Sequence, residues 1–163
     1  MALKFSAADM ESLDNLDNNT TEKREFVKVP TGNYEVRLHS VKCKTCDPDD
    51  YHPEEFYRAV VTFKILNDEY DGMYKGEYVS NVQTLDKVWQ IKLINNFLRS
   101  MKTEVDLSSA RFVVDGEFNP HLYNEVLEEV YDDITAKGFE YQLNVSPQKK
   151  NPKYNEYTIV NVL

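Results

Sequence analysis

Aromatic and basic side chains alternate in two parts of this 163-residue chain, and that mixture suits a single-stranded nucleic acid. Flat rings can stack on bases, which is worth about 1–3 kcal/mol per base, and cations can follow the phosphates. One part covers residues 57–78, and the other is the lysine-rich stretch 149–154. With basic residues from the preceding segment, the candidate DNA-binding residues are Arg37, Lys42, Lys44, Tyr57, Arg58, Lys64, Tyr74, Lys75, Tyr78, Lys149, Lys150, Lys153 and Tyr154.

The candidates have different expected roles. Arg58 and Lys64 are expected to contact phosphates, while Tyr74 and Tyr78 offer stacking surfaces. For any single tyrosine the alternative is a place at the edge of the core, with its hydroxyl in water. The lysine-rich stretch has no such alternative, because three cations in five residues serve no core. The residues expected to close over the strand are Lys42, Lys44, Lys149, Lys150 and Lys153.

The pair Cys43 and Cys46 is the one metal-like arrangement in the sequence, with His39 before it and His52 after it. Tetrahedral zinc needs four ligands, usually from two such pairs, and the chain has no second Cys-x-x-Cys. A redox role lacks the strand-helix-strand context that it needs. We therefore predict no bound metal, with Cys43, Cys46 and His52 as the remaining candidate ligands.

Carboxylates cluster at residues 47–50, 54–55 and 68–71, where paired acids could hold Mg²⁺ or transfer protons. These stretches are rich in turn residues, so a solvated surface is the favoured interpretation. No Ser/His/Asp set and no glycine-rich phosphate loop is recognisable in the sequence. We expect a protein that is not an enzyme and that carries no cofactor.

The net charge of −9 is unevenly distributed. Residues 111–138 carry 2 basic and 7 acidic side chains, a net charge of −5, whereas residues 139–163 carry 3 and 2, a net charge of +1. An acidic chain disfavours a broad basic surface, but it allows a local basic groove. No apolar run approaches the ~18–20 residues that cross a bilayer. Two cysteines and no signal peptide indicate a reducing cytoplasm.

Hydrophobic periodicity then places these residues on elements. An alternating pattern predicts strands at 34–42, 56–66, 76–83, 139–145 and 157–163, and a period near 3.6 predicts helices at 84–101 and 119–138. The polar, acid-rich residues 1–25 predict a flexible N-terminal arm, which leaves 26–163 as one domain. We expect a β-rich α+β fold, a five-stranded OB-type Greek-key barrel with one helix after the third strand and an additional acidic helix before the fourth.

Several segments resemble a family of phage and prophage single-stranded-DNA-binding proteins, long catalogued as a domain of unknown function. They are PTGNYEVRLHSVK, YRAVVTFKILNDEYDGMYKGEYVSNVQT, WQIKLINNFLRSM and FEYQLNV with YNEYTIVNVL, within residues 29–105 and 138–163. The resemblance implies an OB-type fold and non-enzymatic, sequence-tolerant binding of single-stranded DNA. It further implies phage replication or recombination proteins as partners, in the cytoplasm of an infected or lysogenic bacterial host.

Two other classes of function stay open. The acidic residues 111–138 fit a phage interaction module or inhibitor whose DNA-mimicking surface blocks a host nucleic-acid enzyme. The loop carboxylates fit a metal-dependent nuclease. The sequence also leaves a homodimer open.

Overall fold

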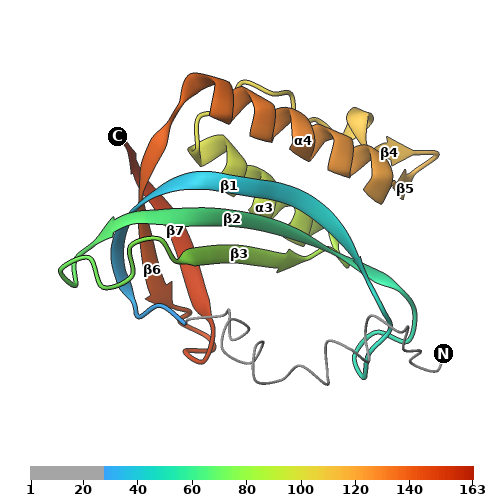
Figure 1. Cartoon of the computed structure of the whole chain (residues 1–163). Coiled ribbons are helices and arrows are strands. Elements are labelled where there is room, and N and C mark those ends of the chain that lie inside the picture. Colours follow the sequence, from blue (N-terminus) through green and yellow to red (C-terminus); the bar gives the residue numbers. More distant parts are fainter. Residues whose placement is uncertain (1–27) are drawn as a thin grey trace, which may run out of the picture.

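The computed structural model describes residues 28–163, so the predicted arm 1–25 lies outside the described residues. One five-stranded antiparallel sheet, in the order β3-β2-β1-β6-β7, is covered on its apolar face by helices α3 and α4 (Figure 1). The predicted β-rich α+β class is confirmed. In chain order the elements are β1 (Gly32–Cys46), β2 (Phe56–Asp68), β3 (Tyr78–Thr84), α3 (Val88–Ser100), the 3₁₀ helix η1 (Ser109–Arg111), β4 (Val113–Val114), β5 (Glu117–Phe118), α4 (Pro120–Lys137), β6 (Glu140–Pro147) and β7 (Asn155–Val162).

The side chains of β2 divide cleanly between two faces. Ala59, Val61, Phe63 and Ile65 are buried, because alternate residues of a strand point to the same face. β1 pairs with β2 along most of its length and with β6 through its first half. Two irregularities in the β1–β2 register bend β1, and Figure 1 shows both strands as long arcs.

The second helix, α4, has the ends that the sequence predicts. The Asn119 side chain accepts a hydrogen bond from the Leu122 amide at 3.0 Å, Pro120 takes the first helical position, and Gly138 ends the helix with φ 67°. Its buried face packs on β1. Each of these signals for a helix end depends only on residues that are close together in the sequence.

Helix α3 begins four residues later than predicted. Thr84 is the last residue of β3, and Lys87 is the helix N-cap. The Gln90 side chain accepts hydrogen bonds from the amides of Asp86 at 2.7 Å and Lys87 at 2.9 Å. This side chain satisfies amides that would otherwise lack partners at the start of a helix.

The predicted closed barrel is not found. Within residues 28–163 no backbone pairing joins β3 to β7, the two edges that closure requires. Helix α3 contacts both β3 and β7 and lies across the space between them. The sheet therefore stays open on that side.

Other differences concern boundaries and short elements. β1 continues to Cys46 instead of ending at residue 42 as predicted, so the connection to β2 is shortened to 47–55. The β4–β5 hairpin was not predicted, because two-residue strands carry no readable period. Neither helix of the part that the structure describes combines the length and the apolar character that a bilayer crossing requires.

Candidate nucleic-acid interface

A groove of about 810 Å³ follows the sheet face that points away from the core and also reaches the buried side chains of Val29 and Val79. β1, β2 and β3 form its floor, and the start of β7 forms one side. The groove therefore borders the space where a closed barrel would pair β3 with β7. Its lining residues are Lys28, Val29, Lys44, Cys46, Arg58, Val60, Thr62, Tyr78, Val79, Ser80, Val82, Asn155 and Tyr157.

The charge of this groove is opposite to that of the whole chain. Lys28, Lys44 and Arg58 line it, and no carboxylate does. Tyr78 adds an aromatic ring that is 47% exposed, with the exposed apolar side chain of Val82 on the same strand. Such a surface offers cations for phosphates and a ring for a base.

Strand alternation and register bring these side chains together. Arg58, Val60 and Thr62 occupy the positions of β2 between the buried residues. Their partners across β3 are Thr84, Val82 and Ser80, which therefore point to the same face. The hydroxyl oxygens of Thr62 and Ser80 lie 2.8 Å apart, and this contact fixes the middle of the groove floor.

Aromatic packing positions Arg58. Its guanidinium lies 5.1 Å from the centre of the Phe56 ring, and the His52 ring stacks on Phe56 with centres 3.8 Å apart. His52 in turn belongs to the loop between β1 and β2. The groove's arginine is thus connected to that loop through two rings.

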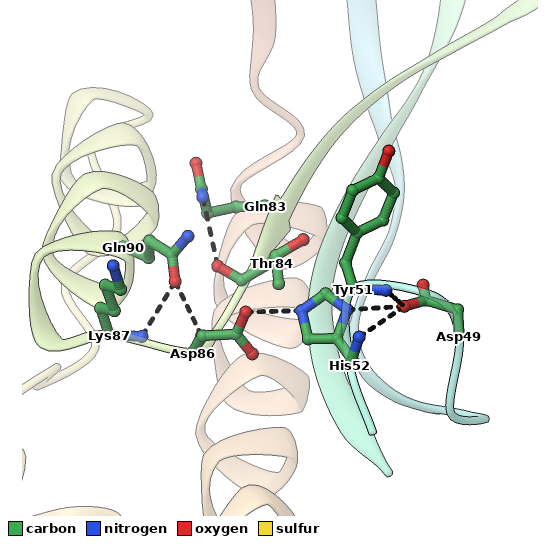
Figure 2. A network of polar contacts seen from close by, with 8 residues as sticks. All are labelled: Asp49, Tyr51, His52, Gln83, Thr84, Asp86, Lys87 and Gln90. Carbon is green, nitrogen blue, oxygen red and sulfur yellow. Dashed lines mark hydrogen bonds and ion pairs between the residues drawn. The ribbon is translucent and has the colours of Figure 1, made fainter. Parts of the chain in front are cut away.

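His52 attaches this loop to the turn before α3, as Figure 2 shows. Its Nδ1 lies 3.0 Å from Asp49 Oδ1, and its Nε2 lies 2.6 Å from Asp86 Oδ2. The hydrogen bond to Asp86 raises the pKa of His52, and the hydrogen bond to Asp49 acts in the same direction. The two carboxylates favour the charged form of the ring, and their contacts with His52 hold the loop at the Arg58 end of the groove.

Other strand candidates lie outside this lining. Lys42 points to the same face and pairs with Val60, and Lys64 lies opposite Tyr78. Arg37 lines a separate hollow of about 390 Å³ with Phe139 and Glu140. The structure thus brings Lys44, Arg58 and Tyr78 together and leaves Arg37 apart.

Two tyrosine candidates and Lys75 also lie away from the groove. Tyr57 is on the core face of β2, with its ring centre 6.4 Å from that of Phe118. Tyr74 packs edge-on against Tyr34 and Tyr70 in the connection between β2 and β3. Lys75 is exposed in the same connection. Tyr57 and Tyr74 serve the core edge rather than a stacking surface.

The lysine-rich stretch forms the exposed connection between β6 and β7. The Gln148 amide donates to the Tyr154 carbonyl at 2.8 Å, which holds the ends of this loop together. Lys149, Lys150, Lys153 and Tyr154 are exposed, and Asn155 and Tyr157 directly after them line the groove. The loop therefore lies at the rim of the groove.

Sequence reasoning missed several lining residues. Thr62 and Ser80 follow from the alternation of the two strands, a signal that was available. Lys28, Asn155 and Tyr157 reach the groove only through the tertiary placement of their segments, and no local pattern reports this.

The Cys-x-x-Cys pair does not gather ligands. Residues three apart on a strand point to opposite faces. Cys43 packs against the core while Cys46 lines the groove, and both ring nitrogens of His52 contact carboxylates. Burial raises the pKa of the Cys43 thiol to about 11. Across residues 28–163, no three His, Cys, Asp or Glu side chains are grouped so that they could hold a metal ion.

The sequence matches no family model and no curated protein. The resemblance to the phage family therefore stays a prediction.

Proposed function

We propose that this chain is a non-enzymatic, sequence-tolerant single-stranded-DNA-binding protein. One observation carries the proposal: a groove lined by three cations and no carboxylate, in a chain of net charge −9. The whole chain has 28 Asp and Glu against 19 Lys and Arg, and the lining of this groove reverses that excess. Tyr78 and Val82 supply exposed apolar surface beside the cations, as stacked bases require.

The fold supports the same proposal, read as an open OB-type sheet. Along the chain, three meandering strands are followed by a helix and later by a final hairpin. The five strands pair in the order β3-β2-β1-β6-β7, which would form an OB barrel if β3 paired with β7. OB domains bind single strands on the face of their second and third strands. The groove occupies that face.

A path for the strand follows from the exposed cations. Lys28, Lys44 and Arg58 contact phosphates along the floor, and Tyr78 stacks on a base. The loop with Lys149, Lys150 and Lys153 closes over the strand from the rim. A phage replication or recombination system in the host cytoplasm is the proposed setting, as the sequence resemblance implies.

The test is binding of a labelled oligothymidine to the full chain, measured by anisotropy over a series of salt concentrations. We expect Lys28→Glu and Lys44→Glu each to weaken binding and to reduce the magnitude of the salt slope by ~0.7, the value for one phosphate contact to a single strand. The matched control is Lys102→Glu, an exposed lysine outside the groove. If both groove variants bind as the control does, the groove is not the site.

The inhibitor class is the second candidate, and one observation favours it. Glu125, Glu128 and Asp132 are exposed along one side of α4 and present a row of carboxylates away from the core. A parent chain that binds no oligonucleotide even at low salt would reject the groove proposal and favour this candidate.

A further inference from the structure

The side chains of β1, β2 and β3 that point away from the core form rows across the sheet, because the same residues of β2 pair with both neighbouring strands. At one end of this face Lys44 is the direct neighbour of Arg58. At the other end Arg37, Lys64 and Tyr78 are direct neighbours. The groove covers only part of the face, since Arg37 and Lys64 are not in its lining.

Two further rows connect these ends. One consists of hydroxyl groups, and the other has one cation beside two valines. Their residues are Ser40, Thr62 and Ser80 in the first and Lys42, Val60 and Val82 in the second. Every charged side chain in the four rows is therefore a lysine or an arginine, and within residues 28–163 none of them forms an ion pair. Phosphates along this face meet cations from one end to the other.

Two aromatic rings meet over the middle strand of this face. His39 is exposed and lies where the register of β1 shifts between Leu38 and Ser40. Its ring centre lies 4.7 Å from that of Tyr78 on β3. Because β2 lies between β1 and β3, the two rings reach towards each other across β2. They offer a surface for base stacking next to the cations Arg37 and Lys64.

Carboxylates border the β1 side of this face. Helix α4 lies along β1 (Figure 1), and its Glu128 and Asp132 line a hollow of about 270 Å³ together with Ser40. On β6, Glu140 is the direct neighbour of Arg37. A strand that crossed the sheet from β3 to β1 would carry its phosphates to these carboxylates. A strand that follows β2 stays among the cations.

We propose that a bound single strand runs lengthwise along β2, from the groove past the rings of His39 and Tyr78 to a second phosphate-binding pair, Arg37 and Lys64. This inference rests on the proposed single-strand binding, and it adds a direction for the strand and a second subsite.

The register also limits the length of this path. Arg58 and Lys64 are six residues apart on β2, so the path is about 20 Å long. That length holds about six nucleotides at the ~3.4 Å spacing of a stacked strand, and fewer if the strand is extended. Glu35, two residues before Arg37 on the same face of β1, ends the series of cations.

The test compares a short and a long labelled oligothymidine, about three and about ten nucleotides in length, by anisotropy with the full chain. The short strand occupies the groove end, where Lys28 and the lysine-rich loop add cations. We expect Arg37→Glu with Lys64→Glu to weaken binding of the long strand about tenfold or more and to reduce the magnitude of its salt slope by ~1.4, for two phosphate contacts. The short strand should lose less than about twofold.

Lys44→Glu should weaken binding of both strands, and Lys102→Glu is the matched control outside this face. Thermal unfolding checks that each variant folds as the parent does. The milder change Arg37→Gln with Lys64→Gln should show the same dependence on strand length, so the test stands even if charge reversal disturbs the sheet.

The outcomes separate this inference from the proposed function. If Lys44→Glu weakens binding but the change at Arg37 and Lys64 leaves the long strand bound as in the control, DNA binding stands and the second subsite is overturned. Equal losses for the short and the long strand would overturn the lengthwise path, because both residues would then act at the groove end. A parent chain that binds neither strand would reject the proposed function itself.

Discussion

The hydroxyl of Tyr123 on α4 donates a hydrogen bond of 2.6 Å to Oδ1 of Asn95 on α3. Tyr123 is fully buried, and Asn95 is the only buried residue with an amide or charged side chain among those that the structure describes. Burial raises the pKa of Tyr123, so its hydroxyl stays protonated and remains a donor. This bond ties the two helices together.

Tyr123→Phe removes the donor and leaves the Asn95 oxygen buried without that partner. We expect the free energy of unfolding to fall by about 1–3 kcal/mol, the cost of an unmet buried polar group. Urea denaturation measures this, with Tyr131→Phe as a control on the same helix, since Tyr131 is only partly buried. Equal losses in the two variants would contradict a special role for the bond.

The contact of His52 with Asp86 and Asp49 predicts a dependence of stability on pH. The folded protein raises the pKa of His52 above its ordinary value of about 6.5. The folded state therefore gains stability from the protonated ring below that value, and it loses this gain as pH rises through the raised pKa.

An NMR titration of the His52 ring checks this prediction. The midpoint is expected above the ordinary value in the parent chain and lower in Asp86→Asn, which removes the main cause of the shift. The difference in melting temperature between parent and Asp86→Asn should be largest under mildly acidic conditions and shrink at higher pH. A midpoint that Asp86→Asn leaves unchanged would show that the contact does not stabilise the charged ring.

Tyr78→Ala and the triple change of Lys149, Lys150 and Lys153 to Glu should weaken DNA binding in different ways. The triple variant is expected to reduce the magnitude of the salt slope by about 2, from ~0.7 for each phosphate contact. Tyr78→Ala should weaken binding at an unchanged slope, because stacking releases no counterions. The control for the ring is Tyr51→Ala, since Tyr51 is 89% exposed and outside the groove. A triple variant that binds like the parent would exclude the loop from the site.

Neighbouring acids on α4 should differ sharply in their effect on stability. The Asp133 carboxylate accepts from the Thr103 hydroxyl at 2.8 Å and the Glu104 amide at 2.9 Å, and it pairs with Lys137 at 3.1 Å. Asp132 is exposed. We expect Asp133→Ala to lower the melting temperature clearly and Asp132→Ala to leave it nearly unchanged, in thermal unfolding at neutral pH. Indistinguishable melting curves would refute this contrast.

The sequence predicts those parts of the fold that local patterns determine. Asn119, Pro120 and Gly138 mark the ends of α4, and the alternation of β2 separates Arg58 from Ala59 and Val61. Closure of the sheet was predicted wrongly, because it depends on how β7 sits against β3. The contacts of Asp133 could not be predicted for a similar reason, since its partners Thr103 and Glu104 lie 29–30 residues away in the sequence.

Some residues of the candidate site could likewise be predicted from local patterns, and others could not. Lys44, Arg58 and Tyr78 were predicted and line the groove: the register pairs Lys44 with Arg58, and strand alternation puts Tyr78 on the same face further along the sheet. Lys28 and Tyr157 were missed, because tertiary placement brings them there. Composition suggested Tyr74 for stacking on a base, whereas its ring packs edge-on against the rings of Tyr34 and Tyr70.

The extension of β1 through Cys46 separates the two thiols of the chain. Residues three apart on a strand have Cα atoms about 10 Å from each other, well beyond the span of a disulfide. Oxidation therefore cannot join Cys43 to Cys46 unless the end of β1 unravels. Cys43 stays packed against the core, with a pKa of about 11, so it is a poor nucleophile at neutral pH. Cys46 opens onto the groove, so a fluorophore attached to this one sulfur would sit beside the bound strand and respond to its arrival.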